Sequence, residues 1–266
     1  MSQSMSQSMS QPMSKLKSMS RPIAVIVGGG PGISASCARL FNAEGMTVIV
    51  AARSPEKPVL QELAKNHGVT NIACDASNPE SVEELFAKVK SDFGSPELVV
   101  HNIDGRVREI FRKSITDAEP EHFTQTVLNS TVSAFLVGQQ AARHMLPNPM
   151  TENGRGSIIY TNASAANKGY PLSGAFAAAC HGKAGLAESM ARELMPQGIH
   201  VASVPIDAAI GWTQEDGSRA HRLAGTSEDD NMADPDFIAQ AYLQIHRQHR
   251  STWTHEVILR PWVEKW

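Results

Sequence analysis

The sequence predicts a single α/β domain built on a doubly wound parallel sheet. From residue 23 onward, short β-branched runs alternate with helical stretches, and a glycine-rich turn follows the first of these runs. Such alternation is typical of βαβ units, in which helices connect parallel strands. Because the chain has 266 residues, 41% of them hydrophobic, it can bury one sizeable core, and we expect one domain over residues 21–266.

The first twenty residues differ from the rest in composition. Residues 1–20 repeat a Met-Ser-Gln-Ser pattern and carry only Lys15 and Lys17 as charges. Such a segment cannot bury enough apolar surface to order itself, so we expect a disordered tail. An acid-free, Ser-rich start would also suit a transit peptide, but arginine and an amphipathic apolar face are missing before Arg21.

Seven short apolar runs, each punctuated by Gly, Pro or Asp, predict a seven-stranded sheet. They span residues 23–27, 47–51, 71–74, 98–101, 157–161, 200–204 and 257–259. Helical segments such as 79–93 and 182–194 lie between them, with apolar residues three and four positions apart. In a doubly wound sheet, ligands bind at the carboxyl ends of the strands.

The first strand runs directly into Gly28-Gly29-Gly30-Pro31-Gly32-Ile33-Ser34, and a helix follows. Glycines permit a tight turn in which backbone N–H groups approach a pyrophosphate, and the helix N-terminus stabilises its charge. We therefore expect Gly28, Gly30, Gly32 and Ile33 to bind a dinucleotide, as in a Rossmann fold. The alternative is a merely structural turn.

The second strand is followed by Arg53 and Ser54, with no Asp or Glu to hold a ribose 2′-hydroxyl. This predicts NADP(H) as the cofactor, because Arg53 can pair with the 2′-phosphate through its planar guanidinium and Ser54 can donate a further hydrogen bond. The alternative for Arg53 is a solvated loop arginine.

These motifs resemble the short-chain dehydrogenase/reductase family from residue 23 to residue 266. The glycine turn is similar to TGxxxGxG, with Val27 for Thr and Ser34 for the last Gly. Ser34 adds a side chain where helix and strand pack closely, which implies weak or shifted cofactor binding. The resemblance further implies that Asp75 contacts the adenine, unless it is an ordinary turn residue. Asn102 keeps the second Asn of the NNAG element.

The catalytic motif of that family is degraded in this sequence. Residues 189–194 and 198–201 resemble the helix and strand that follow the YxxxK motif. Counting back from Glu193 by the family's spacing places Phe176 at the tyrosine and Cys180 at the lysine, so both ionisable groups are absent. Lys183 lies nearly one turn further along, and we expect it to be a solvated helix lysine.

The other polar residues near the expected site are candidates for catalysis and substrate binding. Asp104 replaces the glycine of NNAG, and Ser164 lies one residue past the family's serine position. Tyr170 and Asp207 follow neighbouring strands. We expect these four residues to be catalytic helpers. Asp104 is alternatively a turn acid. Ser130, at the family's asparagine position, and Phe176 and Trp212 are expected to line the substrate pocket. Residues 213–234 suit a mobile substrate loop.

Three functions remain open on the sequence. The first is an NADP(H)-dependent reductase that passes hydride to an already activated acceptor, such as an iminium, without a phenolic proton donor. The sequence is also similar to the fungal alkaloid reductase/Diels-Alderases, which implies a role in secondary metabolism. The second is a cyclase or isomerase that has kept the pocket and lost redox chemistry, with Tyr170, Phe176 and Trp212 shaping an apolar cavity. The third is a non-catalytic binding protein.

Charge and cysteine content narrow the partners and the compartment. The net charge of −3 provides no basic field for nucleic acid or anionic lipid, and no apolar run is long enough to span a membrane. Cys37, Cys74 and Cys180 lack the spacing of a disulfide framework or a metal site, so we expect no metal and a reducing cytoplasm. We expect a small-molecule substrate, and the family resemblance implies a homodimer or homotetramer.

Overall fold

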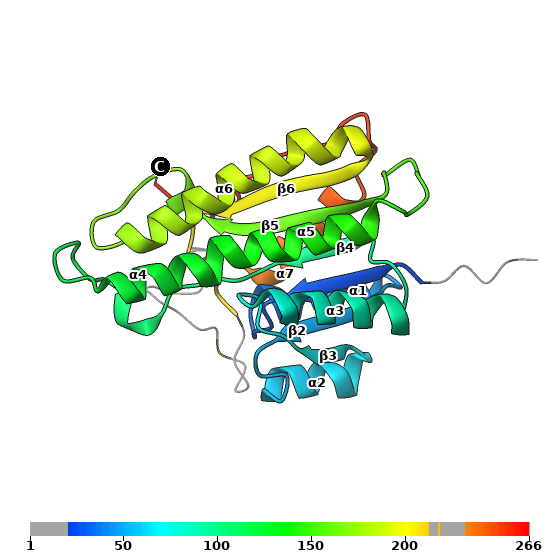
Figure 1. Ribbon diagram of the computed structural model, residues 1–266, viewed down its shortest axis with the longest axis horizontal. Coiled ribbons are helices and arrows are strands. Elements are labelled where there is room, and N and C mark those ends of the chain that lie inside the picture. The colour runs from blue at the N-terminus through cyan, green and yellow to red at the C-terminus, as the bar shows by residue number, and fades with distance from the viewer. Residues whose placement is uncertain (1–20, 213–217, 219–231, 266) are drawn as a thin grey trace, which may run out of the picture.

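The computed structural model of the protein describes residues 21–212, 218 and 232–265 (Figure 1). The expected disordered tail, residues 1–20, lies outside the described residues, as does most of the expected substrate loop, residues 213–234. Among the helices that the structure describes, none has the length and apolar character needed to cross a bilayer.

Six parallel strands form one sheet in the order β3-β2-β1-β4-β5-β6 (Figure 1). The strands are β1 (Ile23–Val27), β2 (Thr47–Ala52), β3 (Thr70–Ala73), β4 (Leu98–His101), β5 (Gly156–Ala163) and β6 (Ile199–Ile206). Because β1 pairs with β2 on one side and with β4 on the other, the strand order reverses at β1. This confirms the doubly wound Rossmann architecture and places the ligand crevice at the carboxyl ends of β1 and β4.

The prediction of a seventh full strand is wrong. Residues 257–259 run beside β6, but they are joined to it by isolated bridges such as Ile206 to Leu259. Hydrogen bonds lie on both sides of one missing bond: Val257 N–H donates to the carbonyl of Ser203, and Leu259 N–H donates to that of Pro205. Pro205 itself has no N–H to give. The ladder is therefore interrupted in its middle, which the apolar pattern of residues 257–259 did not indicate.

Helices cover both faces of the sheet (Figure 1). Alternate residues along the strands enter one of two buried clusters: one is shared with α1 (Ile33–Ala43), α2 (Pro58–His67) and α7 (Pro235–His246), the other with α3 (Pro79–Asp92), α5 (Ser133–Met145) and α6 (Gly174–Leu194). Since strand side chains point alternately to the two faces, β-branched runs with both faces covered are buried throughout, as in β1.

Two local features shape the site end of the molecule. Helix α6 begins at Gly174, eight residues before the helical stretch expected at 182–194, and so brings more side chains to the carboxyl end of the sheet. Between α4 (Pro120–Val127) and α5, residues Leu128–Val132 form one π-helical turn, an uncommon feature that is frequent at functional sites.

Candidate active site

Two cavities open at the carboxyl ends of the strands and share one wall. The nucleotide cavity, about 480 Å³, lies over the glycine turn and the ends of β2 and β3. The substrate cavity, about 520 Å³, lies over the ends of β5 and β6 and against α6. Both cavities are lined by residues that follow β4, namely Asn102, Ile103, Asp104 and Arg106. The segment after β4 is therefore the place where a nucleotide and a substrate would meet.

Gly28 is the residue of the turn that requires glycine. It has a φ of +108°, and a Cβ on it would overlap the backbone carbonyl of Asn102. Its N–H donates to the carbonyl of Ala51 at 2.9 Å, which ties the turn to the end of β2. By contrast, nothing lies within 4 Å of a Cβ built on Gly30. The turn is therefore compact on the sheet side and open on the cavity side, which fits a pyrophosphate above α1.

Ser34 does not occupy the nucleotide cavity. Its side chain is buried, its hydroxyl donates to the carbonyl of Gly28 at 2.5 Å, and it accepts from the Asn102 side-chain amide at 2.6 Å. The serine that stands in place of the family's glycine thus joins the glycine turn to the end of β4. The Asn102 amide is used for this bond, so Asn102 has a structural role in addition to lining both cavities.

Cationic and polar groups collect at the far end of the nucleotide cavity. Arg53, Ser54 and Lys57 line it after β2, and Asp75 lines it after β3. The pKa of the Asp75 carboxyl is lowered, chiefly by its hydrogen bond from Ser77. Lys57 was not expected from the sequence, yet it places a second cation on the wall where a 2′-phosphate would be neutralised. These residues fit an NADP(H) adenosine end.

The predicted cofactor residues fall into three groups. Gly28, Gly30, Arg53, Ser54, Asp75 and Asn102 line the nucleotide cavity. Ile33 instead lines the substrate cavity. Gly32 is the N-cap residue of α1. A Cβ added to Gly32 would lie 3.6 Å from Cγ2 of Ile210. The structure thus brings most of the predicted set together.

The substrate cavity contains nearly all of the residues predicted for catalysis or substrate binding. Its walls include Asp104, Ser164, Tyr170, Phe176, Asp207 and Trp212. Ser130 does not line this cavity: it lies in the π-helical turn, fully buried, against the backbone of Gly105. Its hydroxyl has no hydrogen-bond partner among the described residues. The backbone shift of a π turn moves a side chain off the face that α-helical counting predicts.

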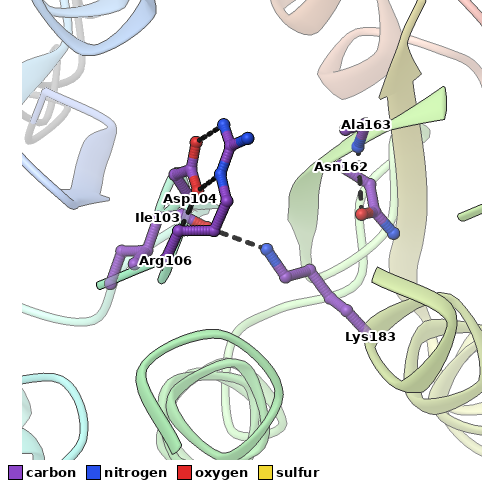
Figure 2. Close-up of polar contacts among 6 residues, drawn as sticks. All are labelled: Ile103, Asp104, Arg106, Asn162, Ala163 and Lys183. Atoms are coloured by element: carbon purple, nitrogen blue, oxygen red, sulfur yellow. Dashed lines mark hydrogen bonds and ion pairs between the residues drawn. The ribbon is translucent and has the colours of Figure 1, made fainter. Parts of the chain in front are cut away.

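Asp104 is held by an arginine that the sequence reasoning missed (Figure 2). Arg106 Nε lies 2.6 Å from Asp104 Oδ1, and a second guanidinium nitrogen lies 2.5 Å from Oδ2. Burial raises the pKa of the Asp104 carboxyl, but the hydrogen bonds and charge of Arg106 outweigh it, and the net pKa is lowered. The guanidinium carbon also lies 3.9 Å from the centroid of the Phe176 ring. Asp104 is therefore a paired carboxylate, unsuited to donate a proton.

Lys183 is a buried cavity residue, and the expectation that it is solvated is wrong. Lys183 is 2% exposed, and its ammonium donates to the carbonyl of Ile103 at 2.9 Å (Figure 2). The ammonium also donates to the carbonyl of Thr161 at 3.3 Å. Burial lowers the pKa of Lys183 from 10.5 to about 8. An ammonium has three N–H groups, so one is left beyond these two bonds. Lys183 lines the substrate cavity.

A helical repeat in the sequence could have identified Lys183 as buried. The buried positions of α6 include Ala175, Ala179, Lys183, Ala187 and Ala191, each four residues after the last. Residues at this spacing lie on one face of a helix. A lysine in a row of alanines is thus expected on the face that packs against the sheet, and counting the family motif back from Glu193 overlooked this.

The wall of the cavity formed by α6 supplies no tyrosine. Phe176 and Cys180 line the cavity at the positions where sequence counting placed the family's tyrosine and lysine. Burial raises the pKa of the Cys180 thiol to about 11, so it is not a thiolate near neutral pH. Hydride chemistry here therefore lacks the phenol that the family motif would place on this helix.

A second polar group lies across the ends of β5 and β6. Asp207 is 5% exposed, and its Oδ2 lies 3.2 Å from Lys168 Nζ and 3.8 Å from Arg260 Nε. The Tyr170 hydroxyl lies 3.3 Å from Ser164 Oγ. Asp207 is thus engaged by two cations, while Ser164 and Tyr170 contact each other.

Comparison with known proteins agrees with this geometry. The family model described as Enoyl-(Acyl carrier protein) reductase matches residues 28–258. The mitochondrial borneol dehydrogenase of Lavandula x intermedia is 30% identical over 206 residues, which cover 76% of this chain and 74% of that protein. An uncharacterized oxidoreductase of Staphylococcus aureus is 27% identical and covers 90% of this chain and 96% of that protein.

Solved structures show the same fold. A short-chain dehydrogenase from Rhodopseudomonas palustris is 30% identical, with a TM-score of 0.71, and covers 91% of this chain and 100% of that one. An alcohol dehydrogenase from Thermococcus sibiricus complexed with 5-hydroxy-NADP has a TM-score of 0.74 at 20% identity, covering 92% and 98% of the two chains. By its glycine turn, its sheet order and these matches, the chain belongs to the short-chain dehydrogenase/reductase family.

Proposed function

We propose that this protein is an NADP(H)-dependent oxidoreductase that transfers hydride between the nicotinamide and a small organic substrate. The observation that carries the proposal is the shared wall: Asn102, Ile103, Asp104 and Arg106 line both the nucleotide cavity and the substrate cavity. The family uses a nicotinamide cofactor, which when bound supplies or accepts the hydride. The chain's own contribution is to hold the two reactants against each other.

The preference for NADP(H) rests on charge at the end of β2. Arg53 and Lys57 line the nucleotide cavity, and the residue directly after β2 is Arg53 instead of a carboxylate. A guanidinium binds a phosphate through two parallel hydrogen bonds. Two cations with a serine hydroxyl between them therefore support the phosphorylated nucleotide.

The substrate is proposed to bring much of its own reactivity, because α6 offers Phe176 where the family motif would have tyrosine. In its simplest form the acceptor is electrophilic before it binds, as an iminium is. Asp104 and Asp207 are each paired with cations, so neither is a free counter-ion for such a substrate. Orientation by the cavity walls then supplies the catalytic effect.

A cyclase or isomerase is the second candidate. It is favoured by the aromatic walls of the cavity, Phe176 and Trp212, which can fix a reactive conformation of an apolar substrate. A role in secondary metabolism, as the resemblance to the fungal alkaloid reductase/Diels-Alderases implies, would suit this reaction. Turnover in the complete absence of NADP(H) would support it over the reductase.

The exposed apolar side chains support the proposal of a homodimer or homotetramer. Three such side chains lie on consecutive elements: Phe123 on α4 is 37% exposed, Leu128 in the π turn is 37% exposed, and Phe135 on α5 is 45% exposed. Apolar patches on a soluble chain favour contact with a second copy. Sedimentation of the purified protein would measure the assembly directly.

Cofactor titration tests the central proposal. NADPH and NADH are added separately to the purified protein while nicotinamide fluorescence and the protein's tryptophan fluorescence are recorded. We expect saturable binding of NADPH and weaker binding of NADH. If neither nucleotide changes the signals at millimolar concentration, the oxidoreductase proposal is refuted.

A further inference from the structure

A phenol, a serine hydroxyl and an ammonium meet in the loop that follows β5. Ser164 begins the short helix Ser164–Ala166, and Tyr170 follows it, with the two hydroxyl oxygens 3.3 Å apart. The Lys168 ammonium lies 5.5 Å from the centroid of the Tyr170 ring. The pKa of Lys168 is raised, by its hydrogen bonds with Tyr170 first and Asp207 second. These groups come from a loop, so no helical motif in the sequence reveals them.

The ammonium is fixed from the opposite side by a buried carboxylate. Asp207 Oδ2 lies 3.2 Å from Lys168 Nζ, and its backbone N–H donates to the carbonyl of Leu259 at 2.8 Å. Arg260 Nε lies 3.8 Å from the same carboxylate oxygen. Asp207 therefore connects the end of β6 to the loop after β5 and holds Lys168 beside Tyr170.

Tyr170 is the tyrosine that the structure places in the substrate cavity. Tyr160 and Tyr242 are fully buried in the core, and their hydroxyls contact Ala134 and Thr161. Tyr170 is 44% exposed and lines the cavity together with Ser164. Its hydroxyl is thus within reach of both solvent and a bound molecule.

We propose that Tyr170 donates a proton to the oxygen of a carbonyl substrate reduced at this site, with Ser164 hydrogen bonded to the same oxygen and Lys168 stabilising the phenolate. The inference rests on the proposed hydride transfer and extends its acceptors from pre-activated compounds to ketones and aldehydes. A loop thereby provides the acid that α6 lacks. Lys168 and Asp207 are positioning residues, because they act through Tyr170.

The step balances with NADPH as the reductant. Hydride from NADPH forms a new C–H bond at the carbonyl carbon, and the C=O π pair moves to the oxygen. The O–H bond of Tyr170 breaks and its proton goes to that oxygen, which gives the alcohol. The phenolate regains a proton from water, which its 44% exposure permits. A nearby ammonium favours the charged phenolate through the intervening step.

The first test measures reduction of two probes by the full chain with NADPH. The probes are para-nitrobenzaldehyde, a carbonyl compound, and methylpyrroline, a cyclic imine that needs no added proton once it is protonated. Loss of a general acid slows a reaction by about 100- to 10,000-fold. We expect Tyr170→Phe to slow aldehyde reduction by this factor in kcat and to leave imine reduction within about 2-fold.

Lys168 is tested by conservative rescue. Lys168→Met should lower kcat for the aldehyde, and Lys168→Arg should restore most of it, because arginine keeps the charge. Lys88→Met is the matched control: it removes an exposed lysine paired with Asp92 and no cavity residue. Equal effects of Lys168→Met and Lys88→Met would contradict a role for the ammonium.

A second readout needs neither cofactor nor turnover. Para-nitrobenzoate has the shape of the aldehyde probe but carries an anionic oxygen, and its binding to the cofactor-free protein is measured by calorimetry. A hydrogen bond to a charged oxygen is worth a factor of about 10 to 100 in affinity. We expect the Kd to rise by this factor in Tyr170→Phe and less in Ser164→Ala, with no change in Lys88→Met.

The outcomes separate this inference from the proposed function. If NADPH binds and the imine is reduced, while Tyr170→Phe alters neither aldehyde reduction nor benzoate binding, Tyr170 is not the acid and the oxidoreductase proposal stands. If wild type reduces the imine but not the aldehyde, the carbonyl assignment is refuted. If NADPH does not bind, or neither probe is reduced, both proposals fail.

Discussion

Replacing Lys183 with methionine tests whether the cavity lysine is truly desolvated. Its pKa falls from 10.5 to about 8 on folding because burial disfavours the ammonium. At 1.36 kcal/mol per pKa unit, this corresponds to about 3 kcal/mol of lost stability while both states are protonated. Two hydrogen bonds to backbone carbonyls offset part of it.

The sign of the pH dependence follows from which state loses its proton first. Below pH 8 the lysine is charged in both states, so the full cost is present. Between pH 8 and 10.5 the unfolded chain binds the proton more tightly than the folded protein, and stability rises with pH. Integration from pH 7 to pH 10 gives a gain of about 2.5 kcal/mol for the wild type that Lys183→Met cannot show.

The assay is urea unfolding of the wild type, Lys183→Met and Lys88→Met at pH 7 and pH 10. Other groups titrate in this range, but all three proteins share them, so the difference between variants isolates Lys183. The wild type and Lys88→Met should gain equally relative to Lys183→Met. If Lys183→Met gains as much as the wild type, Lys183 is solvated and its assignment to the cavity is refuted.

Three further predictions concern the nucleotide cavity and the glycine turn beneath it. Arg53→Ala should raise the Kd for NADPH by about 10- to 100-fold, because a charge-assisted hydrogen bond is lost, and should change the Kd for NADH by less than about 2-fold. Equal weakening of NADPH and NADH binding in a fluorescence titration would contradict the role of Arg53 in binding the 2′-phosphate. Gly28→Ala should lower the free energy of unfolding by more than about 2 kcal/mol, because its positive φ is strained for alanine and the added Cβ would overlap the Asn102 carbonyl. Gly30→Ala should lower it by less than about 0.5 kcal/mol, because nothing lies near the added Cβ. Similar melting temperatures for the two variants would show that the turn is not compact. Ser34→Ala should cost about 1 to 3 kcal/mol in urea unfolding by leaving the Asn102 amide unpaired, and an unchanged midpoint would argue against that bond.

The cofactor end of the site was largely predictable from the sequence. Gly28, Arg53 and Asn102 follow directly after strands, and the carboxyl ends of parallel strands necessarily meet at one edge. Lys57 escaped prediction because it comes several residues after β2, where the loop path decides which side chains return to the cavity. A charge in a loop has no periodicity that reports its direction.

The catalytic end was predicted less well. Family spacing correctly brought Phe176 and Cys180 into the cavity, but it gave Lys183 to solvent although the row of alanines in α6 indicated otherwise. Ser130 was expected in the cavity, yet the π turn directs it against Gly105. Ser130 was placed by aligning residues 135–137 with the family, and such an alignment does not report the π turn that sets the direction of its side chain.

The sequence by itself determined the parallel sheet, the glycine turn and the absence of tyrosine from the motif on α6, because these depend on local pattern and on residue identity. The tertiary structure alone decided the pairing of Asp104 with Arg106, the burial of Lys183 and the contact of Tyr170 with Ser164. It also decided that Pro205 interrupts the pairing of residues 257–259 with β6. Each of these depends on distances between segments that loops connect, and local propensity does not encode the path of a loop.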